Sequence, residues 1–209
     1  MSAAPEPRFD QQPYRWPVPP EGGWTADDLD RIPGLPPHTE LIDGSLVLTS
    51  PQRKFHTRAM WLLESGLLAH LPADLDVDRE MTVKLDRSNR PEPDMLVYRA
   101  EADTGADQTW YAPEDVVLAV EVVSPDSEAR DRETKPRKYA AAQIAHFWRV
   151  EQGLDGLPVV YVYELDPALK AYTPTGIHHN ALKLDVPFPL SIDLTAIDRR
   201  RPRIDRRRP

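Results

Sequence analysis

One hydrophobic segment constrains the fold of this chain more than any other. Residues 116–123 read VVLAVEVV, and Ser124 and Pro125 end the run. β-Branched residues without polar alternation favour a strand that is buried on both of its faces. The segment therefore predicts a buried central strand, in which Glu121 is the one charged residue.

Helical and strand-like segments surround this central strand. Apolar spacing and turn residues predict helices at 26–31, 53–71 and 126–143. Strands are expected as a pair within 39–50 that turns at Asp43-Gly44, and at 76–85, 93–99, 145–151, 158–165 and about 181–186. We expect loops at 100–114 and in the Pro- and Gly-containing stretch before the last strand. The order predicts a mixed α/β sandwich with extra antiparallel strands.

The two ends of the chain differ in composition from the middle. Residues 1–23 are rich in Pro and predict an extended or disordered arm. Residues 199–209 form a tail with seven Arg and one acidic residue. Between them, 24–198 has the length of one domain.

The charge distribution limits the partners of the chain. With 34 Asp+Glu and 26 Lys+Arg the net charge is −8, and without the Arg-rich tail residues 1–198 carry −14. Such an acidic body argues against a protein that coats phosphate backbones. It does not argue against an enzyme that uses clustered carboxylates.

Several chemistries lack the residues that they require. The sequence has no Cys, which excludes disulfides, thiolate metal sites and cysteine nucleophiles. It has no HExxH, GxxxxGK[ST] or GxSxG motif. No run approaches the ~18 apolar residues of a membrane helix, and residues 1–20 lack a secretory signal's apolar stretch, so we expect a cytoplasmic protein without a membrane partner.

Glu121 and Asp94 are the strongest candidates for chemistry. A carboxylate on a buried strand is costly unless it is paired or binds a cation, although a structural salt bridge would serve equally well. Asp94 opens its strand and Glu121 lies near the end of the next long strand. If these strands are antiparallel neighbours, the two carboxylates converge. Hard oxygen ligands of this kind favour Mg²⁺.

Lys135 is the third candidate. It follows Glu121 by one turn and a helix start, so its ammonium could reach over the carboxylates and stabilise charge on a phosphate. Pro136 biases Lys135 away from helical backbone angles, which predicts that the helix begins at Pro136. A solvated surface Lys is the alternative interpretation, and the sequence leaves open whether Lys135 or Lys138 is the functional lysine.

The remaining signals are weaker. Glu40, before Asp43-Gly44, and His56, on the 53–71 helix, could join a site or serve as ordinary surface residues. His178-His179 falls in a predicted loop and has no spaced carboxylate partner. Three of the five tryptophans are interpreted as core or edge packing rather than base-stacking platforms: Trp61, Trp110 and Trp148.

Taken in order, these landmarks resemble the Uma-two family of restriction-endonuclease-like proteins within the PD-(D/E)xK nuclease superfamily. The resemblance covers residues 39–151, with weaker similarity to about 197. It is carried by ELIDG at 40–44, His56, Pro93-Asp94, EVVSP at 121–125, Asp131, Lys135, Tyr139 and HFWRV at 146–150.

The resemblance implies a core of αβββαβ order and metal-dependent phosphodiester hydrolysis. By analogy, Asp94, Glu121 and the Val122 carbonyl would bind Mg²⁺ or Mn²⁺, and Glu40 would be an auxiliary acid. Lys135 would replace the usual Lys two residues after the Glu, a position that Val123 occupies here.

The sequence therefore predicts a metal-dependent endonuclease that acts on DNA. The alternative is a catalytically inactive binding or interaction module on the same scaffold, which the acidic body favours. A third interpretation makes the carboxylates purely structural. Paired cuts on two strands would need two sites and hence a homodimer, although no residue points to one.

Overall fold

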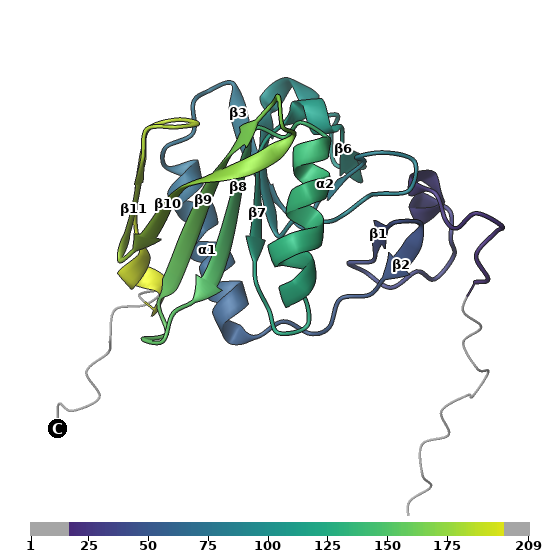
Figure 1. Ribbon diagram of the computed structural model, residues 1–209, viewed down its shortest axis with the longest axis horizontal. Helices are drawn as coiled ribbons and strands as arrows, with labels where there is room; N and C mark the ends of the chain where they lie inside the picture. The colour runs from purple at the N-terminus through teal and green to yellow at the C-terminus, as the bar shows by residue number, and fades with distance from the viewer. Residues whose placement is uncertain (1–16, 199–209) are drawn as a thin grey trace, which may run out of the picture.

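The computed structural model describes residues 17–198, and its centre is a six-stranded sheet (Figure 1). The strands follow the order β10-β9-β8-β7-β5-β3. Their bounds are β3 Leu75–Arg79, β5 Met95–Arg99, β7 Val116–Val122, β8 His146–Gln152, β9 Pro158–Asp166 and β10 Ala171–His179.

Two α-helices and several short elements complete this part of the chain. The helices are α1 Lys54–Leu68 and α2 Lys135–Ala141, with a π-helical turn η4 Arg130–Thr134 directly before α2. The 3₁₀ turns are η1 Ala26–Asp30, η2 Ala100–Ala102, η3 Pro113–Asp115 and η5 Leu194–Asp198. The short strands are β1 Glu40–Ile42, β2 Ser45–Val47, β4 Thr82–Val83, β6 Trp110–Tyr111, β11 Ala181–Leu184 and β12 Leu190–Asp193.

The core has the predicted αβββαβ order. It runs α1, β3, β5, β7, α2, β8, and the extra strands β9 and β10 extend the sheet beyond β8. Strand β7 pairs antiparallel with β5 and parallel with β8, so it is a central strand, as its hydrophobic run predicted. The mixed α/β class is confirmed.

The helices cover opposite faces of the sheet (Figure 1). Leu63 and Leu67 of α1 pack with Leu118 and Val120 of β7 in one apolar cluster. Tyr139 of α2 belongs to a second cluster with Ala119 and Phe147. Because side chains alternate along a strand, Glu121 shares the α2 face with Ala119.

Three predicted elements differ from the observed ones. The strand expected at 76–85 is divided into β3 and β4 at Glu80, whose φ is 56°. The loop expected at 100–114 contains β6, which pairs parallel with β4. The loop expected before residue 181 is wrong, because β10 occupies it and includes His178 and His179.

The prediction that the helix begins at Pro136 is also wrong. Lys135 has helical angles, φ −63° and ψ −46°, and η4 runs into α2 without a break. Proline normally clashes with the carbonyl four residues earlier. The π-helical turn widens the backbone just before Pro136 and offers a physical reason why the helix continues through it.

The Pro-rich arm is described only from residue 17, and the Arg-rich tail at 199–209 lies outside the described residues. Within residues 17–198, no helix is long and apolar enough to cross a membrane.

Candidate active site

Asp94 and Glu121 meet at one end of the paired strands β5 and β7. The antiparallel register places Met95 opposite Val120, so Asp94 lies beside the end of β7. The Val122 backbone N–H donates to Asp94 Oδ2 at 2.6 Å. On the other side, His56 Nε2 of α1 lies 3.0 Å from Asp94 Oδ1. Sheet register and two hydrogen bonds therefore fix this carboxylate.

Glu121 is buried and both of its oxygens have protein partners. The side chain of Tyr139 donates to Oε1 at 2.6 Å, and Lys135 Nζ donates to Oε2 at 3.0 Å. Burial raises the pKa of Glu121 well above its ordinary value, and the Lys135 charge offsets this only in part. Asp131 and Asp94 add to the rise because like charges disfavour ionisation.

Lys135 lies at the centre of the carboxylates with only 4% of its surface exposed. Its Nζ is 2.8 Å from Glu40 Oε1, 3.0 Å from Glu121 Oε2 and 3.7 Å from Asp131 Oδ1. Burial alone would lower the pKa of Lys135. The charges of Glu121, Glu40 and Asp131 together outweigh burial and hold this pKa well above its ordinary value, so Lys135 stays charged.

Glu40 reaches the cluster because its strand is tied to the chain segment just before Asp94. Leu41 of β1 forms a bridge with Arg90, and the Glu92 N–H donates to Glu40 Oε1 at 2.8 Å. Arg90 is itself buried and pairs with Asp30 at 2.7 Å. This contact holds the N-terminal segment against the sheet.

Lys138, the alternative lysine, is directed elsewhere. Its Nζ pairs with Asp43 Oδ1 at 2.5 Å in the β1–β2 turn. It is absent from the side chains that line the cavity around Asp94, whereas Lys135 is among them. Of the two lysines left open by the sequence, Lys135 is the one beside the carboxylates.

Two acidic residues near the site were not predicted as members. Asp131 is 1% exposed, accepts a hydrogen bond from Ser127, and has a pKa raised to about 6 by burial. Glu92 lies 2.6 Å from His38 Nδ1, and burial raises the pKa of Glu92 to about 6. The four-residue spacing of Asp131 and Lys135 could have revealed the first, because it puts both on one helix face.

These side chains line a cavity of about 460 Å³. Seven of the lining residues are acidic: Glu40, Glu80, Glu92, Asp94, Glu121, Asp126 and Asp131. His56, Val122, Lys135 and Arg130 also line it. All site residues predicted from the sequence therefore meet in one cavity.

The donor set suits a hard cation, because carboxylate and carbonyl oxygens are the ligands that Mg²⁺ prefers. Asp131 Oδ1 is buried without a hydrogen bond, with Lys135 Nζ 3.7 Å away, so it is a further oxygen that could accept a hydrogen bond or bind a cation. Within residues 17–198, however, no three His, Cys, Asp or Glu side chains already stand in a metal-binding arrangement. Two carboxylates, one carbonyl and several waters would meet the octahedral preference of Mg²⁺.

An αβββαβ sheet with an Asp, a Glu and a Lys in one cavity defines the restriction-endonuclease-like class of proteins. A family model described as "Putative restriction endonuclease" matches residues 26–196. The chain therefore belongs to the Uma2 family.

One solved structure has a similar fold. It is described as a "putative nuclease belonging to DUF820" from Anabaena variabilis, with a TM-score of 0.65 and 14% sequence identity. The match covers 83% of this chain and 96% of that one. Among curated proteins, none matches this sequence.

Proposed function

We propose that this protein is a metal-dependent endonuclease that hydrolyses phosphodiester bonds in DNA. One observation carries the proposal: the buried pair of Glu121 and Lys135 lies beside Asp94 in an open cavity. A buried ion pair is weak evidence for stability alone. Titratable groups whose pKa values are shifted by burial and by a charged partner, and which lie in a cavity, are candidates for a functional site.

Asp94, Glu121 and the Val122 carbonyl would hold Mg²⁺ or Mn²⁺. The bound metal would supply Lewis acidity toward the phosphate and a more acidic water. The Asp94 carboxylate is already oriented by the Val122 N–H and by His56, so little freedom is lost when it binds a cation. Each of its oxygens keeps a second lone pair for that purpose.

Lys135 would stabilise negative charge that develops on the phosphate oxygens. Glu40 and Glu121 keep its ammonium charged. A donor that the protein holds in place away from bulk water stabilises developing charge more strongly than a donor in water. Glu40 would act as the auxiliary acid that orients Lys135. Tyr139 would orient Glu121 through its 2.6 Å hydrogen bond.

DNA cleavage with and without Mg²⁺ tests this proposal. Supercoiled and linear DNA are incubated with the wild type, Asp94→Ala and Glu121→Ala. Lys138→Ala serves as a control because Lys138 lies on α2, the helix that carries Lys135, but outside the cavity. We expect cleavage by the wild type and Lys138→Ala only. Absence of cleavage in all four proteins, or equal cleavage in all four, would reject the function.

A second candidate is an inactive binding module on the same scaffold. It is favoured because every oxygen of Asp94 and Glu121 already accepts a hydrogen bond from the protein. Melting temperature as a function of Mg²⁺ or Mn²⁺ separates the two candidates. A rise in the wild type that Asp94→Ala loses supports the nuclease, and no rise in either supports the inactive module.

A further inference from the structure

The cavity around Asp94 is lined by more acidic than basic side chains, which disfavours a phosphate ligand. Seven carboxylic acids line it, whereas its permanent cations are Lys135 and Arg130. A metal ion bound by Asp94 and Glu121 would offset part of this excess. A nucleic acid strand brings further negative charge, so it needs a protein cation that is free to contact it.

Lys135 is already engaged by the protein. Its ammonium contacts Glu40 and Glu121, and it also donates to the Glu92 carbonyl at 3.3 Å. Two of the three N–H donors of the ammonium form hydrogen bonds, to Glu121 and to the Glu92 carbonyl, and the Glu40 carboxylate forms a further close ion pair with it. Lys135 can turn toward the scissile phosphate only by giving up one of these partners.

Arg130 is in the opposite situation. It is half-buried at the start of the π-helical turn, and its Nε–H is buried without a hydrogen-bond partner. Within the described part of the chain, no carboxylate forms an ion pair with Arg130, whereas Arg132, two residues on, pairs with Glu128 and Glu151. A buried donor without an acceptor costs free energy, so the Arg130 side chain gives up no hydrogen bond at Nε when it turns toward a ligand.

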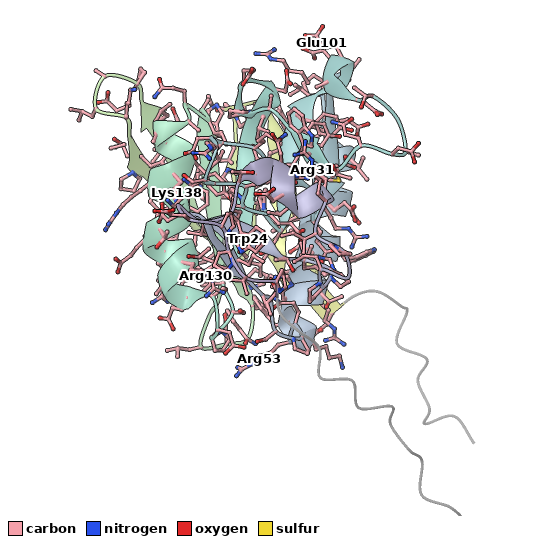
Figure 2. The ribbon with its side chains drawn as sticks, turned by 90° about the vertical axis from the view of Figure 1, so that its right-hand side faces the viewer. Trp24, Arg31, Arg53, Glu101, Arg130 and Lys138 are labelled. Atoms are coloured by element: carbon pink, nitrogen blue, oxygen red, sulfur yellow. The ribbon has the colours of Figure 1, made fainter. Side chains whose placement is uncertain are left out.

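The position of Arg130 suits a substrate contact. Figure 2 shows its side chain on the same face of the molecule as Lys138 and Arg53. It lines the same cavity as Asp94, Glu121 and Lys135, and Asp131 beside it contacts Lys135. π-Helical turns occur frequently at functional sites. A planar guanidinium can bind two oxygens of one phosphate at once.

We propose that Arg130 is the phosphate-binding residue of this cavity and holds a backbone phosphate of the bound DNA strand. The inference rests on the proposed function, because DNA is the source of the phosphate. It assigns substrate binding to Arg130 and leaves Lys135 to the carboxylates and the reacting group.

Binding of a fluorescein-labelled DNA duplex in Ca²⁺ as a function of salt tests the assignment. The proteins are the wild type, Arg130→Ala, Arg130→Lys and the control Arg137→Ala. Arg137 carries the same charge on α2, is 79% exposed and does not line the cavity. We expect Arg130→Ala to weaken binding by about tenfold or more and to reduce the salt slope by about 0.9, the value for one phosphate contact.

Arg130→Lys should fall between the wild type and Arg130→Ala, because an ammonium keeps the charge without the two-pronged geometry. Arg137→Ala should bind within about twofold of the wild type. The melting temperature of Arg130→Ala should not fall, because its buried Nε–H has no partner to lose. A structural role would instead lower it.

The outcomes separate this inference from the nuclease proposal. DNA that binds through Arg130 but is not cut in Mg²⁺ supports the phosphate site and rejects the nuclease. DNA that is cut while Kd and KM are unchanged in Arg130→Ala rejects the phosphate site alone. Equal losses in Arg130→Ala and Arg137→Ala, or a wild type that binds no DNA, also overturn the inference.

Discussion

Lys135→Met removes the ammonium that Glu40, Glu121 and Asp131 share, and it replaces a long side chain with an apolar one of similar length. Removing one partner of a buried ion pair costs about 3–5 kcal/mol, because the other charge is left uncompensated. Here the surviving charges are two or three buried carboxylates. We therefore expect the free energy of unfolding at pH 7.5 to fall by about 3–5 kcal/mol.

Urea unfolding measures this loss, and an unchanged m-value would show that only the stability has changed. In a chain of this size the loss corresponds to a melting temperature lower by roughly 6–20 °C. Lys138→Met is the matched control, because Lys138 pairs with Asp43, whose side chain is 71% exposed, and such pairs contribute about 1 kcal/mol or less. The double variant Lys135→Met/Glu121→Gln should recover part of the lost unfolding free energy, because it also removes one of the carboxylates left without a cation.

The loss should also depend on pH. Burial raises the pKa of Asp131 to about 6, so this carboxylate takes up a proton as the pH falls toward 5. Protonation then replaces the missing cation, and the loss in Lys135→Met should be smaller at pH 5 than at pH 7.5. A loss below about 1 kcal/mol, or one equal to that of Lys138→Met, would refute the reasoning.

Two further predictions concern the carboxylates around Lys135, and a third concerns the packing of α1 against β12. The folded-state pKa of Asp131 is about 6 and its ordinary pKa is 3.8, so the folded state holds this proton more tightly and stability falls by about 3 kcal/mol as the pH rises from about 4 through 6. Asp131→Asn should flatten the dependence of the urea-unfolding free energy on pH between 4 and 7, and an unchanged slope would contradict the assignment. Tyr139→Phe removes the donor to Glu121 and should cost about 1–3 kcal/mol in the same assay, whereas a neutral result would show that another donor replaces it. Gly66→Ala places a Cβ 2.5 Å from Ile192 Cδ1, and despite a helix-propensity gain of about 1 kcal/mol it should lower the melting temperature; an increase would show that α1 and β12 pack more loosely than described.

The central strand could be predicted from a local pattern, and the meeting of Asp94 with Glu121 could be predicted from that strand and one assumption about pairing. The run at 116–123 identifies a buried strand without reference to the rest of the chain. Antiparallel pairing of this strand with the one after Asp94 is an assumption at the level of sequence, and β5 and β7 do pair in this way. Antiparallel pairing then brings the start of one strand to the end of the other.

Other features depend on tertiary context that a linear pattern does not contain. Strand β10 includes Pro174, which normally argues against a strand. It is tolerated because β10 is an edge strand and has a register shift between Pro174 and Gly176. The helical angles of Lys135 depend on the π-helical turn before Pro136. No residue type in the sequence predicts such a turn. The buried Asp131 follows from that same turn.

A change of metal preference tests the central claim most directly, namely that Asp94 binds the cation that supports DNA cleavage. The sequence has no Cys, so Asp94→Cys introduces a unique thiolate at the proposed ligand position. Thiolates bind soft cations better than Mg²⁺. Asp43→Cys in the β1–β2 turn is the control, because it lies outside the cavity. We predict that Asp94→Cys does not cut DNA with Mg²⁺ but regains cleavage with Cd²⁺, while Asp43→Cys cuts with Mg²⁺. Cleavage by Asp94→Cys at the wild-type rate in Mg²⁺ would contradict the claim.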